Sequence, residues 1–417
     1  MRDAGIERYD YLIVGGGLAS VAAIDGIREL DREGSIALLG EEREPPYHRP
    51  PLSKEFLQAP EIGRELLHVK PEGWLEQEAR VTFLGGQRIV SLDPREKVVA
   101  SASGARYQAK RILLATGGRP RTLDVPGAEL EGVFTLRSVK DAEEIRSAAA
   151  AAERAVLVGA GFIGMELASS LLKLGVQSVI VEARDRAWAQ ALPPAISHFM
   201  RRYFEQRRVR FQFGAAVRSF EGDERVEAVV LEDGRVLPCD LVVVGIGITP
   251  NMELAEETGL AVQDGIVVDP YGETSHAYIY ASGDVARFPD STFGGYSRLE
   301  HWDHAKVHGR LVGRNMAGAR EPYRHLSHFF SDVFDLKLNV LGRTAQAEQV
   351  VVRGKLGSER AVVLCGTEGR LTGAILVNAT DVLEEHRELV QQGAPLEEPP
   401  GEIDEDSLTE PVAGGNA

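Results

Sequence analysis

Two stretches of the chain repeat the same order of hydrophobic and polar positions. Each begins with a short apolar run, passes through a glycine-rich turn into a pattern with a period near 3.6 residues, and ends in a second apolar run. Short apolar runs predict buried strands, and the 3.6-residue period predicts a helix. The first stretch predicts a strand at Tyr9–Val14, a helix at Leu18–Glu29 and a strand at Ser35–Leu39; the second predicts a strand at Ala155–Val158, a helix at Met165–Leu174 and a strand at Ser178–Val181. We therefore expect an α/β chain with two βαβ units.

The remaining pattern predicts that the second βαβ unit is inserted into the domain that holds the first. Two further apolar runs, Arg111–Ala115 and Leu241–Val244, each lead into a tight glycine turn, where the chain could cross between domains. Later segments predict a strand at Ala277–Tyr280, a helix starting near Arg298, and antiparallel strands at Val350–Arg353, Ala361–Leu364 and Leu371–Val377. The expected organisation is a first domain at 1–119 and 249–323, a second at 120–248, a C-terminal domain at 324–392 and a disordered acidic tail at 393–417.

The two glycine-rich turns have the spacing of a dinucleotide-binding motif. They are Gly15-x-Gly17-x-x-Ser20 and Gly159-x-Gly161-x-x-Gly164. Small residues let the backbone approach a pyrophosphate, and the helix that follows offers free N–H groups and the positive end of its dipole. A serine at the third position is tolerable because that position mainly governs the packing of the helix on the strand. Two such turns in one chain disfavour the alternative of βα turns that bind nothing.

Acidic residues follow the second strand of each unit. Glu41 and Glu42 could accept hydrogen bonds from an adenosine ribose, and Glu182 lies at the corresponding strand end of the second unit. A carboxylate at that place binds the ribose 2′-hydroxyl and repels a 2′-phosphate, which predicts NADH rather than NADPH. Arg184, two positions later, could accommodate a phosphate and leaves NADPH open.

The net charge and the hydropathy of the chain disfavour two classes of binding partner, nucleic acids and membranes. The formal net charge of −16 disfavours nucleic acid and anionic membranes, which need a basic surface. No apolar run reaches the roughly 18 to 20 residues that span a bilayer, and the first ten residues are polar. We therefore expect a cytoplasmic protein, either a monomer or a homodimer, with no nucleic-acid or membrane partner.

Cysteine and histidine positions argue against metal and disulfide chemistry. The two cysteines, Cys239 and Cys365, are too far apart in sequence to indicate a metal site or a disulfide framework. His301, His304 and His308 could share a helix face, but they lack the His-Glu-x-x-His pattern of zinc sites. We therefore expect no metal.

Nine segments, in a common order and spacing, carry a resemblance that extends to about residue 380. They are YLIVGGGLAS, PYHRPPLSKEF, ILLATGGRPR, FTLRSVKDA, VLVGAGFIGMELA, VVGIGITPN, ASGDVA, EHWDHA and FFSDVFD. With them the chain resembles the ferredoxin-reductase and apoptosis-inducing-factor branch of the FAD-dependent pyridine-nucleotide oxidoreductases. The resemblance implies two Rossmann-like domains of the glutathione-reductase type plus a small α+β C-terminal domain. It places FAD on the first glycine turn and NADH on the second.

The resemblance also implies roles for single residues. Arg49 and Lys54 would contact the flavin region, and His301 and Trp302 would lie beside its pyrimidine edge. Glu166 would face Lys54, and we expect this pair to be the catalytic one. The full set assigned to FAD is Gly15, Gly17, Ser20, Glu41, Glu42, Arg49, Lys54, Ile89, Thr116, Gly117, Arg137, Asp284, His301 and Trp302, and the set assigned to NAD is Gly159, Gly161, Gly164, Glu182, Gly247 and Glu300.

The activity implied is transfer of a hydride from NADH to FAD, followed by electron transfer to a ferredoxin or a similar small iron–sulfur protein. No cysteine precedes position 239, so the dithiol relay of related disulfide reductases is disfavoured and electrons should leave the flavin directly. Two alternatives stay open. One is an NADH oxidase and redox sensor resembling apoptosis-inducing factor, with a stable reduced flavin–NAD complex. The other is a flavoprotein binding module that NADH switches.

Overall fold

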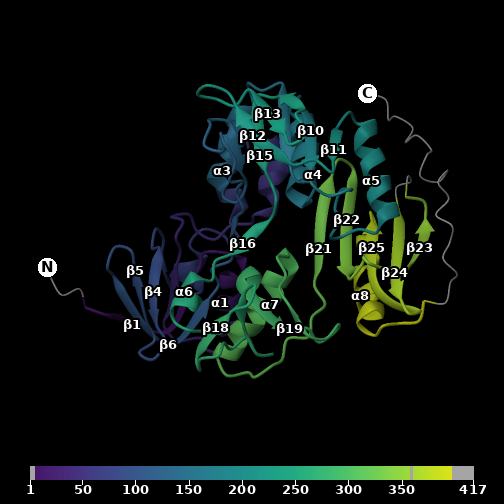
Figure 1. Ribbon diagram of the computed structural model, residues 1–417. Helices are drawn as coiled ribbons and strands as arrows, with labels where there is room; N and C mark the ends of the chain where they lie inside the picture. Colours follow the sequence, from purple (N-terminus) through teal and green to yellow (C-terminus); the bar gives the residue numbers. More distant parts are fainter. Residues whose placement is uncertain (1–4, 357–359, 397–417) are drawn as a thin grey trace. The chain divides into compact units, whose positions relative to one another are not determined.

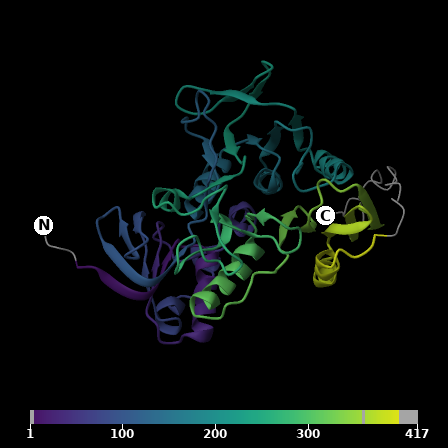
Figure 2. The same ribbon diagram turned by 60° about the horizontal axis from the view of Figure 1, so that its bottom comes forward.

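The computed structural model describes residues 5–356 and 360–396 (Figures 1 and 2). These residues form two compact units. The first unit runs up to His48 and also contains Gly63–Arg119 and Ile248–Ser327. The second contains Arg49–Ile62, Pro120–Gly247 and the chain from His328 onward. Each unit is therefore built from three separate segments of the sequence.

The first unit is built around a sheet with the strand order β3-β2-β1-β6-β5-β4, and β18 also pairs with β6. Strands β1, β2, β3, β6 and β18 pair in parallel, whereas β4 and β5 are antiparallel. Their bounds are β1 (Glu7–Val14), β2 (Ile36–Leu39), β3 (Val81–Leu84), β4 (Ile89–Asp93), β5 (Val98–Ser101), β6 (Arg106–Leu114) and β18 (Ile279–Ala281). Every residue of β2 is buried, as expected of a parallel strand covered on both faces.

Shorter elements complete the first unit. A three-stranded sheet has the order β17-β19-β20, and β7 pairs with β16 where the chain leaves and re-enters the unit. The bounds are β7 (Gly118–Pro120), β16 (Ile248–Pro250), β17 (Ile266–Val267), β19 (Ala286–Pro289), β20 (Tyr296–Ser297), α6 (Glu253–Glu257), η2 (Arg64–Leu67), the π-helix η3 (Trp74–Glu78) and η4 (Gly283–Val285).

Helices α1 (Leu18–Leu30) and α7 (Trp302–Met316) pack with their backbones in very close approach. A Cβ atom on Gly26 of α1 would lie 2.0 Å from the carbonyl oxygen of Arg310. A Cβ atom on Gly313 of α7 would lie 2.0 Å from the carbonyl oxygen of Ala23. Glycine costs roughly 1 kcal/mol in a helix relative to alanine, and here it allows two helices to approach more closely than any side chain would permit.

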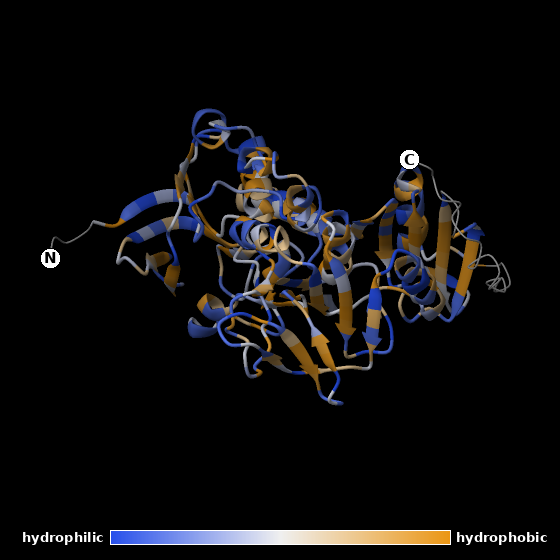
Figure 3. Ribbon diagram, turned by 90° about the horizontal axis from the view of Figure 1, so that it is seen from above, coloured by the Kyte–Doolittle hydropathy of each residue, from blue (hydrophilic) through white to orange (hydrophobic). Residues whose placement is uncertain are grey.

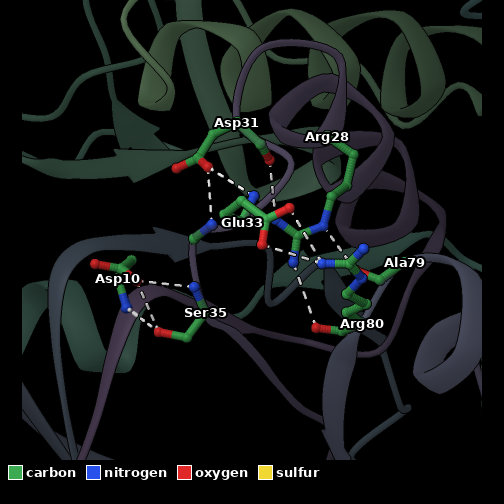
Figure 4. Close-up of polar contacts among 8 residues, drawn as sticks. Asp10, Arg28, Asp31, Glu33, Ser35, Ala79 and Arg80 are labelled. Carbon is green, nitrogen blue, oxygen red and sulfur yellow. Dashed lines mark hydrogen bonds and ion pairs between the residues drawn. The ribbon is translucent and has the colours of Figure 1, made fainter.

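A polar cluster holds the loop between α1 and β2 (Figure 4). Arg28 donates through Nε to the carbonyl oxygen of Ala79 at 2.7 Å and through Nη1 to that of Asp31 at 2.9 Å. The Asp31 carboxylate accepts the backbone N–H of Glu33 at 3.1 Å. The short loop is thereby fixed, and β2 starts in register beside β1.

The second unit contains a five-stranded parallel sheet with the order β11-β10-β9-β15-β8. A three-stranded antiparallel sheet, β12-β13-β14, belongs to the same unit. The bounds are β8 (Val133–Thr135), β9 (Arg154–Val158), β10 (Gln177–Glu182), β11 (Arg210–Phe213), β12 (Val217–Glu221), β13 (Ala228–Leu231), β14 (Val236–Pro238), β15 (Leu241–Val244), α3 (Val139–Ala149), α4 (Phe162–Lys173) and α5 (Pro194–Gln206). Segment 49–62 adds η1 (Pro50–Ser53) and α2 (Glu55–Gln58) to this unit.

The C-terminal part of the second unit is an antiparallel sheet with the order β21-β22-β25-β24-β23. Hydrophobic residues run along these strands (Figure 3), and helix α8 packs on β22 and β25. The bounds are β21 (His328–Val333), β22 (Leu336–Gly342), β23 (Gln349–Gly354), β24 (Ala361–Thr367), β25 (Arg370–Val377), η5 (Thr380–Val382) and α8 (Leu383–Gln391). The three strands predicted here are confirmed, whereas β21, β22 and α8 were not predicted.

Three predictions are corrected. The helix expected from Arg298 begins only at Trp302, with His301 as its N-cap. Helix α4 begins at Phe162, one turn before the predicted start, because Gly164 lies inside its first turn against the carbonyl oxygen of Gly159. The start of the supposedly disordered tail is ordered: Leu396 is buried and its N–H donates to the carbonyl oxygen of Gly369 at 2.8 Å. The rest of that tail, 397–417, lies outside the described residues.

Candidate cofactor sites

The first glycine turn contains one glycine that the fold requires and one that it does not. Gly15 has a φ of +119°, and a Cβ there would lie 2.1 Å from the carbonyl oxygen of Ala115. Gly17 has an ordinary φ of −102°, and a Cβ there would meet no atom within 4 Å. Neither backbone conformation nor packing therefore demands glycine at position 17. Free space at this position is what the close approach of a pyrophosphate needs.

The start of α1 suits an anion. No side chain caps the helix at Gly17, and its first turn holds no acidic residue. Ser20, at the third position of the motif, is buried and its hydroxyl donates to the carbonyl oxygen of Gly15 at 2.5 Å. The serine thereby closes the turn from inside and leaves the N-terminal N–H groups and the positive helix end to a phosphate. These residues fit the pyrophosphate of FAD.

The second glycine turn also contains one glycine that the fold requires and one that it does not. Gly159 has a φ of +106°, and a Cβ there would lie 2.5 Å from the carbonyl oxygen of Gly245. At Gly161 the nearest atom to an added Cβ is the same oxygen, at 4.0 Å. Helix α4 also starts without a side-chain cap and without an acid in its first turn. The turn therefore fits a second dinucleotide.

Glu182 lies at the end of β10, where its carboxylate meets the second glycine turn. One oxygen accepts the backbone N–H of Ala160 at 2.7 Å, and the other accepts that of Arg184 at 2.9 Å. The guanidinium of Arg184 lies against the side-chain amide of Gln190. The carboxylate is thus fixed beside the turn, with lone pairs left for a ribose hydroxyl, while the neighbouring cation is engaged elsewhere.

The other residues of the first unit that were assigned to FAD differ in their hydrogen bonds and in their exposure. Thr116 and Gly117 are held by Asn251, whose side chain donates to the Thr116 carbonyl oxygen at 2.9 Å and whose N–H donates to that of Gly117 at 3.0 Å. Glu42 accepts the hydroxyl of Tyr47 at 2.5 Å, whereas Glu41 is 73% exposed and lies 3.7 Å from Arg88. Two further positions are Ile89, the first residue of β4, and Asp284, which is half-buried in η4.

Trp302, at the N-terminus of α7, contacts His48, a histidine to which the sequence assigned no role. Trp302 donates its indole N–H to Nδ1 of His48 at 3.2 Å. An indole N–H is only a donor, so Nδ1 of His48 must be the unprotonated nitrogen. Burial, and the charge of Lys306, lower the pKa of His48, which favours this neutral form. His301 contacts Ser327, and Glu300 pairs with Arg298 at 2.8 Å.

The second unit contains the predicted catalytic pair in contact. Nζ of Lys54 lies 2.8 Å from a carboxylate oxygen of Glu166, and both side chains are over 90% buried. Two residues that sequence reasoning missed also hold the carboxylate: Ser53, which donates to the same oxygen, and Ser331, which donates to the other at 2.8 Å. Both serines lie in the motifs PYHRPPLSKEF and FFSDVFD, which was the available signal.

Two more assigned residues of this unit lie together. Nη1 of Arg49 donates to the backbone carbonyl oxygen of Arg137 at 2.5 Å. Arg137 itself precedes α3, which begins with a capping box between Ser138 and Asp141. Gly247 has a φ of +102° with no atom within 4 Å of an added Cβ.

His304, His308 and both cysteines are deeply buried. His304 and His308 stack with ring centroids 4.8 Å apart, and burial lowers the pKa of His308 to about 3. His301 does not share their helix face, because it lies before the helix. The described part of the chain holds no group of three or more potential metal ligands. Burial raises the pKa values of Cys239 and Cys365 to about 12, so neither thiol is a nucleophile at neutral pH.

Comparison with known protein families agrees with this geometry. Residues 9–309 match the model of the pyridine nucleotide-disulphide oxidoreductases, and residues 328–405 match that of the reductase C-terminal domain. The chain belongs to the pyridine nucleotide-disulphide oxidoreductase family. The resemblance predicted from the sequence is confirmed, as are the α/β fold class and the use of FAD and NAD(P)H.

Individual relatives within this family cover almost the whole chain. Rhodocoxin reductase of Rhodococcus erythropolis is 36% identical, over 88% of this chain and 86% of its own. Rubredoxin-NAD(+) reductase of Ectopseudomonas oleovorans is 35% identical, over 88% and 95%. The structure of a covalent putidaredoxin reductase–putidaredoxin complex matches with a TM-score of 0.89 and 30% identity, over 96% of this chain and 99% of that one. Within the described ranges, no helix of this family member is long and apolar enough to cross a membrane.

Proposed function

We propose that this protein is an NADH-dependent flavoprotein reductase that passes electrons to a ferredoxin-type iron–sulfur protein. The observation that carries the proposal is the pair of glycine turns, each with one glycine that only a ligand requires. Gly17 and Gly161 open onto free space at uncapped helix N-termini. A chain with two such turns can hold two dinucleotides, as transfer between them requires.

The assignment of FAD to the first turn and NADH to the second is part of this proposal, as are the domain limits and the site residues predicted above. The place of Glu182 beside the second turn supports NADH, because a carboxylate there favours a free ribose 2′-hydroxyl. When bound, FAD would accept two electrons at once and release them singly. Lys54 and Glu166 would orient the reacting groups and keep a buried, water-poor environment.

The acceptor follows from the relatives and from the chemistry of the cysteines. The relatives are named reductases of rhodocoxin, rubredoxin and putidaredoxin. Both cysteines are buried, and their pKa values are raised, so a dithiol relay within this chain is disfavoured. Neither the redox-sensor alternative nor the binding-module alternative is favoured by these comparisons. Unpaired cysteines and dependence on NADH also support a cytoplasmic location.

A basic groove between α1 and α7 supports docking of an acidic partner on this acidic chain. It is lined by four cations and two acids: Arg28, Lys70, Lys306, Arg310, Asp25 and Glu29, together with Ala22. Lys306 is exposed, and its ammonium lies 5.1 Å from the ring centroid of Trp302. A local excess of positive charge steers an acidic protein to this face.

Anaerobic stopped-flow absorbance tests the proposal. The FAD-loaded protein is mixed first with NADH and then with a ferredoxin. Fast loss of the oxidised-flavin bands followed by fast reoxidation by ferredoxin is the expected result. Slow bleaching with a persistent long-wavelength band that ferredoxin leaves unchanged would instead favour the redox-sensor alternative. Absence of flavin reduction by either NADH or NADPH would contradict the proposal.

A further inference from the structure

One buried carboxylate collects donors from two distant parts of the second unit. Glu166, on α4, is 4% exposed. Segment 50–54 brings the Lys54 ammonium, at 2.8 Å, and the Ser53 hydroxyl. The C-terminal sheet brings the hydroxyl of Ser331, at 2.8 Å from the other carboxylate oxygen. Ser331 is completely buried, so no water competes for this contact from outside.

The packing of β21 on α4 sets this contact. Phe162 and Glu166 are one turn apart on α4, and Phe329 and Ser331 are two positions apart on β21, so each pair shares a face. The rings of Phe162 and Phe329 lie 4.1 Å apart between centroids, which fixes the register and leaves Ser331 opposite Glu166.

A second set of contacts closes the same region. The N–H of Phe334 donates to Oγ of Ser169 at 2.7 Å, just after β21. Ser170 donates to the backbone carbonyl oxygen of Ser53 at 2.6 Å, and this holds segment 50–54 against α4. The hydroxyls of Ser53 and Ser331 are therefore delivered by rigid, packed elements on two sides of the carboxylate.

These donors have a chemical consequence. A hydrogen bond to an ionised carboxylate favours the ionised form, and a buried ion pair is stable only when its remaining lone pairs are satisfied. Lys54 is held in turn by the Pro50 carbonyl oxygen at 3.1 Å and lies 5.8 Å from the ring centroid of Phe330. The C-terminal sheet thus contacts both members of the pair, Glu166 through Ser331 and Lys54 through Phe330.

We propose that Ser331 is a positioning residue for flavin reduction: the C-terminal domain uses its hydroxyl to hold the Glu166 carboxylate aimed at Lys54. The inference rests on the proposed function, because it assigns work to the Lys54–Glu166 pair in hydride transfer. It gives the C-terminal domain a part in the chemistry as well as in the packing of the fold.

The test is single-turnover reduction of the flavin by NADH in the FAD-loaded Ser331→Ala variant. With one donor removed, the Glu166 carboxylate is held less firmly against Lys54, so the limiting rate constant of flavin reduction should fall about tenfold. The dissociation constant for NADH, taken from the dependence of the same rate on NADH concentration, should stay at the wild-type value. The elements that pack on α4 carry the charged groups Lys54, Glu55, Arg154, Glu182, His328 and Asp332, and α4 itself ends in Lys173. Of these, only Lys54 contacts the Glu166 carboxylate among the residues described.

Ser197→Ala is the matched control. Ser197 is a buried serine of α5 in the same unit, and its hydroxyl has no hydrogen-bond partner among the described residues. Its loss should leave the limiting rate of flavin reduction unchanged. Ser331→Cys, nearly isosteric but a weaker donor, guards against a folding defect and should lower the limiting rate by a smaller factor than Ser331→Ala does.

Failure of the inference about Ser331 and failure of the proposed function would give different results. A wild-type limiting rate of flavin reduction in both Ser331 variants, with only a lowered melting temperature, would overturn the inference and make Ser331 a packing contact. Failure of the wild-type protein to reduce its flavin with NADH would instead count against the proposed function itself.

Discussion

Replacing Gly17 by alanine should separate cofactor binding from folding. At a φ of −102° alanine is unstrained, and its Cβ would meet no protein atom within 4 Å. The substitution therefore leaves the apoprotein intact, or stabilises it by roughly 0.4 to 1 kcal/mol through the entropy of the unfolded chain. The added methyl group occupies the space beside the helix N-terminus that we assign to the FAD pyrophosphate.

The size of the effect on FAD follows from the hydrogen bonding of its phosphates. A phosphate pushed off the helix N-terminus loses at least one hydrogen bond to a charged group, worth about 1.5 to 3 kcal/mol. The dissociation constant for FAD should therefore rise by about 10- to 150-fold. Gly15→Ala is the matched contrast. Its φ of +119° and a Cβ 2.1 Å from the Ala115 oxygen should lower the free energy of unfolding of the apoprotein by at least about 2 kcal/mol.

Both variants are measured as apoproteins. Urea unfolding gives the stability, and quenching of flavin fluorescence during titration gives the affinity for FAD. The reasoning is refuted if Gly17→Ala binds FAD as tightly as the wild type. It is equally refuted if Gly17→Ala destabilises the apoprotein as much as Gly15→Ala does, because the glycine would then serve the fold.

Three further predictions concern charge. Glu182→Ala should lower the ratio of kcat/KM for NADH to kcat/KM for NADPH about tenfold, because the variant loses both the hydrogen bond to the NADH ribose and the repulsion of the NADPH 2′-phosphate. An unchanged ratio would show that Glu182 does not discriminate between the two cofactors. Lys306→Glu should raise the KM for an acidic ferredoxin several-fold, and the increase should be larger at low salt. The rate of reduction of an uncharged quinone should stay constant. Lys337→Glu, a control at an exposed position of β22, should leave the KM for ferredoxin unchanged. Burial lowers the pKa of His308 to about 3, so below about pH 6.5 only the unfolded chain takes up the proton, and the free energy of unfolding should fall by up to about 1.4 kcal/mol per pH unit down to about pH 3. His308→Phe, which keeps the ring packing, should flatten that slope, and an equal slope in both proteins would show that His308 is not buried in its neutral form.

The sequence alone was sufficient to identify both glycine turns and the strands and helices around them. These features depend on residues close together in the chain: an apolar run, a turn that needs a positive φ at Gly15 or Gly159, and a helix directly after it. The strand predicted at Leu241–Val244 is observed with the same bounds. Strands β21 and β22 were missed, although β22 is almost entirely buried, because a short mixed pattern does not reveal which face a later helix will cover.

Tertiary structure decided which residues act together. Lys54, Glu166 and Ser331 lie far apart in the sequence, and nothing local to Ser331 shows that its hydroxyl will meet a buried carboxylate. The contact of His48 with Trp302 joins positions 254 apart. The distinction between Gly15 and Gly17 is of the same kind, because it depends on whether another strand lies against the added Cβ. Local pattern determines where a backbone can turn and what it can bind, whereas hydrogen-bond partners, burial and free space arise only when distant segments pack.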